Sequence, residues 1–126
     1  MPIFEIKALQ QKTGVNTREA MKKLCKEIAS LMKLPEHQVW ATWHSIESGD
    51  FIEGGNSAEV QPDSTHPPIV NLIAFEGRSP ELMEQVILKA AEILSTELKL
   101  SPGNIYMHFT ETGTGRTYSG GQLRKR

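Results

Sequence analysis

The sequence predicts an α/β (α+β) fold, in which two tandem βαβ units form a four-stranded sheet with two helices on one face. The first supporting observation is an internal repeat: Pro2 and Pro68 are 66 positions apart (68 − 2), and the pairs Gly54-Gly55 and Gly120-Gly121 keep the same offset without a gap. The second is that each half begins and ends with alternating apolar and polar residues. The third is that an apolar stripe with helical spacing lies between these segments. Each half therefore contains a strand, a helix and a strand.

The first repeat, residues 2–56, supplies two strands and one helix. Residues 2–8 alternate apolar and polar side chains, which is typical of a strand with one buried face. Thr17 is the expected N-cap of a helix whose apolar stripe continues until Pro35 stops it. Residues 39–44 alternate again and contain β-branched and aromatic residues, so they form the second strand. Residues 49–55, which begin and end with glycine, turn the chain.

The second repeat, residues 68–126, follows a linker of residues 57–67 that is polar and contains two prolines. Residues 68–75 form the third strand, and Ser79-Pro80 provides a cap and a first-turn proline for the second helix. Residues 105–110 form the fourth strand. We expect one domain over residues 1–126. The predicted buried face of the second helix consists of Met83, Val86, Ile87, Ala90, Ala91, Leu94 and Leu98.

The sheet of this fold has one face without helices. Parallel strands joined by a helix require a right-handed crossover, so both helices cover the same side. The opposite side carries large apolar and aromatic residues, which a monomer would expose to water: Trp40, Ile69, Ile73 and Tyr106. We therefore predict oligomerisation through the uncovered faces.

The composition favours a soluble enzyme or binding protein over a nucleic-acid or membrane protein. The chain has 126 residues, a net charge of −1 and 38% hydrophobic residues, so neither phosphate polymers nor anionic membranes attract it generally. No basic leader with an apolar run follows Met1, and the lone Cys25 excludes a disulfide framework, so we expect a cytoplasmic protein. The four histidines lack paired metal-ligand spacing. The closing run Arg124-Lys125-Arg126 is interpreted as a solvated end.

Several segments resemble one known family. Residues 68–79, PIVNLIAFEGRS, are similar to the opening strand and turn of the tautomerase superfamily, residues 109–111 to its closing strand, and Gly120-Gly121 to its C-terminal hairpin. In the first repeat, Pro2 and residues 49–55 carry the likeness. Each half resembles a 4-oxalocrotonate tautomerase subunit. The resemblance implies a tautomerase/MIF-like fold, assembly as a homotrimer, and keto–enol isomerase activity without a cofactor.

The resemblance also implies that Pro2 is the catalytic base. Once Met1 is removed, Pro2 has a secondary amine with a free lone pair, whereas Pro68 is locked into an amide and cannot accept a proton. A model α-amine has a pKa of about 8, and an apolar pocket lowers this pKa by disfavouring the cation. The free amine would move a proton from an enol oxygen or activated carbon to another atom of the substrate.

Arg78 is the second implied catalytic residue, because the family places a carboxylate-binding arginine in the EGRS stretch. Without the resemblance, Arg78 would be interpreted as a solvated turn residue; its counterpart in the first repeat is Lys12. The family's second arginine falls on Trp40 and Tyr106 here. An aromatic pocket with one arginine favours a monocarboxylate with an apolar end, such as phenylenolpyruvate, over the 2-hydroxymuconate type of dicarboxylate. Phe51 matches the family's apolar hairpin phenylalanine, and His108, on the same predicted strand as Tyr106, would assist proton transfer. The substrate-binding candidates are Trp40, Phe51, Tyr106 and His108.

Other activities remain open on the sequence. The dehalogenase and decarboxylase patterns of the superfamily need charged residues where Phe75, Ser119 and Gln38 stand, so both are disfavoured against tautomerisation. A ferredoxin-like regulatory domain or a cytokine-like, protein-binding module, as in macrophage migration inhibitory factor, would need no base at Pro2. The predicted ligand is a small-molecule carboxylate, with no metal.

Overall fold

The computed structural model describes residues 1–125, so Arg126 lies outside the described part of the chain. The repeat prediction is confirmed at the level of the elements, since strand, helix and strand occur twice in order. The elements are β1 (Ile3–Ala8), α1 (Thr17–Met32), the short 3-10 helix η1 (Glu36–Gln38), β2 (Trp40–Ser45), β3 (Ile52–Glu53), β4 (Asn56–Ser57), β5 (Ile69–Phe75), α2 (Pro80–Glu97), β6 (Tyr106–Thr112), β7 (Thr117–Ser119) and β8 (Gln122–Arg124).

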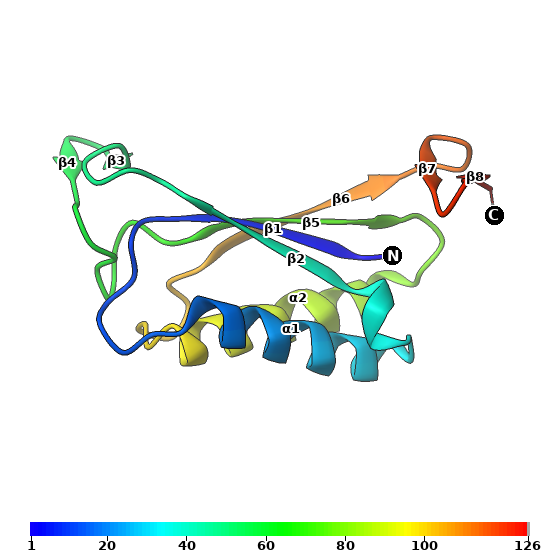
Figure 1. Cartoon of the computed structure of the whole chain (residues 1–126), viewed down its shortest axis with the longest axis horizontal. Coiled ribbons are helices and arrows are strands. Elements are labelled where there is room, and N and C mark those ends of the chain that lie inside the picture. The colour runs from blue at the N-terminus through cyan, green and yellow to red at the C-terminus, as the bar shows by residue number, and fades with distance from the viewer. Residues whose placement is uncertain (126) are drawn as a thin grey trace.

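The four long strands form one mixed sheet in the order β2-β1-β5-β6. Strands β1 and β2 are parallel, as are β5 and β6, whereas β1 and β5 pair antiparallel at the centre. Both helices lie on one side of this sheet, and the hairpins β3-β4 and β7-β8 extend from its opposite ends (Figure 1). The predicted fold class is therefore confirmed.

The antiparallel centre of the sheet relates the two repeats by an approximate two-fold rotation. In the first repeat the backbone N–H of Trp40 donates to the carbonyl of Pro2, and in the second the N–H of Tyr106 donates to the carbonyl of Pro68, both at 3.0 Å. Because β1 and β5 run in opposite directions, these two equivalent places lie at opposite ends of the sheet. A site beside Pro2 therefore lies at the opposite end of the sheet from the equivalent place beside Pro68.

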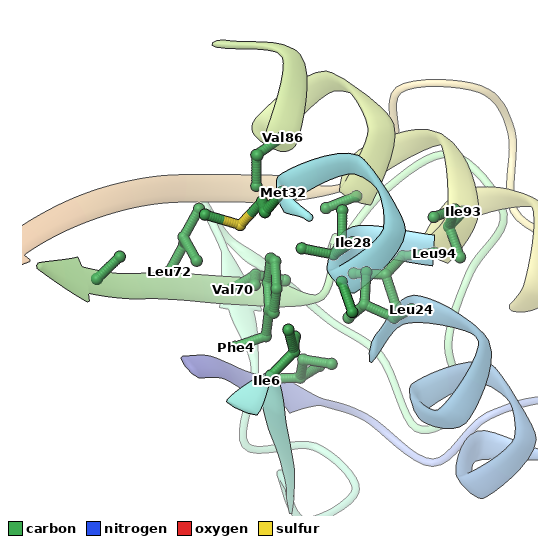
Figure 2. Close-up of a cluster of buried hydrophobic side chains, with 14 of the residues drawn as sticks. Phe4, Ile6, Leu24, Ile28, Met32, Val70, Leu72, Val86, Ile93 and Leu94 are labelled. Atoms are coloured by element: carbon green, nitrogen blue, oxygen red, sulfur yellow. The ribbon is translucent and has the colours of Figure 1, made fainter. Parts of the chain in front are cut away.

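The core lies between the sheet and the two helices (Figure 2). Side chains from β1 and β5, including Phe4 and Leu72, are fully buried against apolar residues of α1 and α2. The predicted buried face of α2 is confirmed at Met83, Val86, Ala90, Leu94 and Leu98. Ile93, which the prediction missed, is also buried, whereas Ile87 and Ala91 are half-buried. Ile93 belongs to the same core cluster as the other buried residues of α2.

The N-cap of α2 is the residue predicted from the sequence, whereas the N-cap of α1 is one residue earlier than predicted. Ser79 caps α2 by accepting a hydrogen bond from the N–H of Leu82 at 3.2 Å. The cap of α1 is Asn16, whose side-chain oxygen accepts from the N–H of Glu19 at 3.1 Å, so the prediction of Thr17 was wrong. Both residue types are good N-caps, and the choice depends on which one has extended backbone geometry.

The helix-free face of the sheet is open in the single chain, as predicted. Trp40 is 44% exposed and Tyr106 is 56% exposed on this side. Exposed aromatic side chains of this size are typical of a surface that is covered by a ligand or another protein. Within residues 1–125, none of the helices is both long and apolar enough to cross a membrane.

Candidate active site

A cavity of about 400 Å³ opens at the end of the sheet where the chain begins. This volume is within the usual range for small-molecule pockets. Four separate parts of the chain line it: the amino terminus, η1 with the start of β2, the end of β5, and the β7-β8 hairpin. The lining residues are Met1, His37, Gln38, Trp40, Phe75, Ser119, Gly120 and Arg124. None of them is acidic, which makes the cavity suited to an anion.

The amino-terminal amine is the group in this cavity whose chemistry is most altered. Burial lowers the pKa of the Met1 amine, and the positive charges of Arg78 and Arg124 lower it further. All three causes disfavour the ammonium form, so the neutral amine is populated at a lower pH than at an ordinary amino terminus. Pro2, the next residue, is fully buried. With Met1 present, the Pro2 nitrogen is part of an amide and has no basicity.

Arg78 is held at the edge of the cavity by the turn between β5 and α2. Its Nη1 donates to the carbonyl of Phe75 at 3.4 Å, and Phe75 itself lines the cavity. Arg78 does not form part of the cavity wall, but its charge acts on the Met1 amine. Because Arg78 has no ion-pair partner among the described residues, its guanidinium retains donors for an incoming anion.

Arg124 lines this cavity, so the interpretation of Arg124 as part of a solvated end was wrong. It is not part of a solvated end but belongs to β8, where its Nε donates to the Ser119 hydroxyl at 3.0 Å. A Cβ built on Gly120 would lie 2.7 Å from Arg124 Nη2, so the guanidinium packs directly over this glycine. The signal for this position is Gly120-Gly121, which forms the turn that brings Arg124 back toward the amino terminus.

Trp40 is the one predicted substrate-binding residue that lines the same cavity. It begins β2, two residues after the last residue of η1, and its indole N–H donates to the carbonyl of His37 at 2.9 Å. This hydrogen bond fixes the ring plane, since the nitrogen cannot turn away without losing its partner. The Trp40 and Phe75 rings provide the apolar part of an otherwise cationic cavity.

The other three candidates, Phe51, Tyr106 and His108, are not in this cavity. Phe51 packs against His66, with 5.0 Å between the ring centroids, next to the β3-β4 hairpin at the other end of the sheet (Figure 1). The ring centroids of Tyr106 and His108 are 6.4 Å apart. Tyr106 pairs with Ile69 of β5, and Ile69 in turn pairs with Lys7 of β1. Trp40 instead pairs with Ile3, which lies four residues, or about 13 Å, from Lys7 along β1. One chain therefore does not bring all the candidates together.

The equivalent place in the second repeat is filled by the linker. Asn104, the counterpart of Gln38, donates from Nδ2 to the linker carbonyls of Pro62, Asp63 and Thr65 at 3.4, 3.0 and 3.0 Å. Lys12, the counterpart of Arg78, forms an ion pair with Asp63.

Glu53, the counterpart of Ser119, accepts a hydrogen bond from the N–H of His66 at 3.1 Å. His66 is itself buried, as is Gln61, so the linker is packed into the protein. The two repeats have thus diverged. The residues around Pro2 surround a cavity, whereas the corresponding residues around Pro68 contact the linker. In the described chain, no group of three or more His, Cys, Asp or Glu side chains could hold a metal ion.

The fold has close counterparts among solved structures. No protein-family model matches the sequence, and no curated protein matches it. A native fused 4-OT superposes with a TM-score of 0.82 at 18% identity, covering 96% of this chain and 94% of that one. Pt0534 inactivated by 2-oxo-3-pentynoate gives 0.80 at 11% identity, and a wild-type fused 4-OT symmetric trimer gives 0.80 at 17%. Both comparisons cover 97% of this chain and 94% of the other. The chain therefore has the same fold as these fused 4-OT structures.

Proposed function

We propose that this protein is a cofactor-independent tautomerase that uses the amine of Pro2 as a general base on a small enol or 2-keto acid. The observation that supports this most is the cavity at the chain start, which is lined by Met1 and Arg124 without an acidic residue and where the charges of Arg124 and Arg78 lower the pKa of the Met1 amine. An ordinary chain start is mobile and solvated, whereas this one is partly buried and held beside cations. Such an arrangement suits a neutral amine acting next to an anion.

The proposed mechanism begins with removal of Met1, which places the secondary amine of Pro2 at the end of the chain. Burial and the neighbouring arginines, which lower the pKa of the Met1 amine, would act in the same direction on Pro2. The neutral amine takes a proton from an enol hydroxyl or an activated carbon and returns it to another carbon of the same substrate. The substrate gains and loses one proton, so no oxidant or cofactor is required.

Arg78 would bind the substrate carboxylate and stabilise the negative charge that develops on the enolate oxygen. Its terminal N–H groups match the two oxygens of a carboxylate. Trp40 and Phe75 would contact the carbon skeleton of the substrate and exclude water. Phenylenolpyruvate and 2-hydroxymuconate are the two substrate types to test, since both combine a carboxylate with a conjugated enol.

Phe51, Tyr106 and His108 can take part only if another copy of the chain supplies them. A wild-type fused 4-OT with the same fold is a symmetric trimer. We therefore include a homotrimer in the proposal, assembled through the helix-free sheet face on which Trp40 and Tyr106 are exposed. Analytical ultracentrifugation of the protein tests this part, and a monomer at assay concentrations would contradict it.

The test of the base compares Pro2 with its matched control, Pro68. Mass spectrometry first establishes which preparation lacks Met1, and an ultraviolet assay then follows enol-to-keto conversion. For the Met1-free protein we expect Pro2→Ala to lower kcat by about 10²-fold or more, the usual contribution of a general base, because the ring amine is lost. Pro68→Ala should retain the rate, since Pro68 is held in an amide. A preparation that keeps Met1 should be inactive because Pro2 is acylated.

A covalent label provides a second readout of the same amine. Pt0534, which has this fold, is inactivated by 2-oxo-3-pentynoate. We expect this reagent to add its mass to the amino-terminal peptide of the Met1-free protein, by attack of the Pro2 nitrogen on the alkyne carbon. Arg78→Ala should slow both labelling and turnover. Full turnover in Pro2→Ala, or labelling elsewhere in the chain, would refute the proposed base.

A further inference from the structure

We propose that a groove between α1 and the edge strand β2 binds a single-chain amphiphile, an alkyl chain that carries a phosphate head. The groove has a volume of about 900 Å³, near the upper end of the range for small-molecule pockets. It lies on the helix side of the sheet, so assembly through the helix-free face leaves it open. The lining residues are Arg18, Met21, Lys22, Cys25, Lys26, Glu36, His37 and Ala41.

The floor of the groove is apolar. Met21 and Cys25 lie about one helical turn apart on α1, and Ala41 contributes from β2. All three side chains are half-buried and pack against the main core cluster, so the fold fixes their positions. An alkyl chain laid on this floor removes apolar surface from water, which is favourable by about 25 cal/mol for each Å². The floor therefore suits the apolar part of a ligand.

The wall that α1 forms is cationic. Arg18, Lys22 and Lys26 are spaced four residues apart, so they share one face of the helix over about 12 Å of its length. Lys22 forms an ion pair with Glu19 at 3.6 Å, whereas neither Arg18 nor Lys26 has an ion-pair partner among the described residues. Their long, flexible side chains can converge on one anionic group. Several cations around one group suit a phosphate, which offers more acceptor oxygens than a carboxylate.

The charge of the lining is unbalanced although the chain as a whole is nearly neutral. Three cationic residues face a single acidic lining residue, Glu36, in a chain with a net charge of −1. Burial, and then the negative charge of Glu36, raise the pKa of the Cys25 thiol, so this thiol is neutral and adds no charge to the floor. A local excess of positive charge beside an apolar floor is complementary to an anionic head on an apolar chain.

Cys25 provides a reporter for this groove, because it is the one cysteine of the chain and does not line the cavity at the chain start. The experiment follows alkylation of Cys25 by N-ethylmaleimide in the full chain by peptide mass spectrometry, below the micelle concentration of each amphiphile. We expect dodecyl phosphate to slow the alkylation in a saturable manner, since its chain covers the thiol. Butyl phosphate, with a short chain, and dodecyltrimethylammonium, with the opposite charge, should leave the rate unchanged.

Two double variants with the same change in net charge test the cationic wall. The affinity is taken from the dodecyl phosphate concentration at half-protection, so a change in the intrinsic reactivity of the thiol does not affect it. Arg18→Ala/Lys26→Ala should weaken binding about tenfold, or about threefold for each exposed charge contact. Lys23→Ala/Lys33→Ala is the matched control, because these cations of α1 and its C-cap do not line the groove. It should bind as the wild type does, and circular dichroism checks the folding of each variant.

Three results would overturn the proposal: no protection by dodecyl phosphate, equal protection by either control ligand, or equal losses of affinity in the two double variants. Protection by phosphatidate vesicles without protection by monomeric dodecyl phosphate would also overturn it, because the groove would then bind a membrane surface. Pro2→Ala should keep the protection of the wild type. The outcome is therefore independent of whether Pro2 is a catalytic base.

Discussion

Asn104 provides the sharpest test of how the linker is held against the second repeat. Its side chain is buried, and the two protons of its amide face three linker carbonyls, those of Pro62, Asp63 and Thr65. Two protons can satisfy two good hydrogen bonds at once, each of which contributes about 1 kcal/mol net to stability. Each carbonyl also has a second donor, from Gln61 or from the N–H of Ser101, so no acceptor is left unpaired when Asn104 is lost.

We therefore expect Asn104→Ala to lower the free energy of unfolding by about 2 kcal/mol. For a chain of this length the loss corresponds to a Tm lower by about 6–10 °C. Asn104→Asp should be more destabilising, because it places a carboxylate against carbonyl oxygens and leaves no donor. The matched control is Gln38→Ala, at the equivalent place beside the open cavity, where the side chain makes no hydrogen bond to a described residue; we expect a change within about 0.5 kcal/mol.

The assay is thermal and urea unfolding followed by circular dichroism, at one protein concentration for all variants because assembly would add to the apparent stability. Wild-type Tm in Asn104→Ala would refute the reasoning, as would a loss in Gln38→Ala of the same size. The first result would mean that the linker does not depend on this amide, and the second that the two ends of the sheet are equivalent.

Two further predictions concern the amine and the core. Removing Arg78 or Arg124 takes away a positive charge that disfavours the ammonium form, so the pKa of the amino-terminal amine rises. The acidic limb of the pH–rate profile then moves to higher pH in either alanine variant; a limb that moves to lower pH would contradict the assigned charges. Leu94→Ala removes a fully buried core side chain and should cost about 2–5 kcal/mol in urea unfolding, whereas Leu88→Ala, at a position 71% exposed, should cost little; similar losses would contradict the packing.

The sequence is sufficient to predict the elements of the fold because its local patterns and its repeat agree. Alternation in residues 2–8 and 68–75 is supported by helical stripes at the same offset, and the sheet, both helices and the Ser79 cap are found as predicted. The N-cap at Asn16 was missed because Asn and Thr in adjacent positions offer the same chemistry. Such a difference depends on a single backbone angle, which the residue types alone do not determine.

The candidate site could be predicted only in part, because it depends on the relative directions of the strands in the sheet. Pro2, Arg78 and the place of Trp40 follow from the resemblance to the tautomerase superfamily rather than from the periodicity of the elements. Tyr106 was assigned to the same pocket by repeat equivalence, yet the antiparallel pairing of β1 and β5 puts equivalent residues at opposite ends. Arg124 lies five residues beyond Ser119, and its return to the cavity depends on a tight turn between two three-residue strands that periodicity does not reveal.

The packing of the linker against Lys12, Glu53 and Asn104 leads to a prediction about the stoichiometry of ligand binding. Where the first repeat presents a cavity, the second presents hydrogen bonds already made within the chain. A calorimetric titration with a tightly bound carboxylate ligand should therefore saturate at one molecule per chain, despite the two-fold repeat. In a trimer, three sites would be filled at saturation, each beside a different chain start.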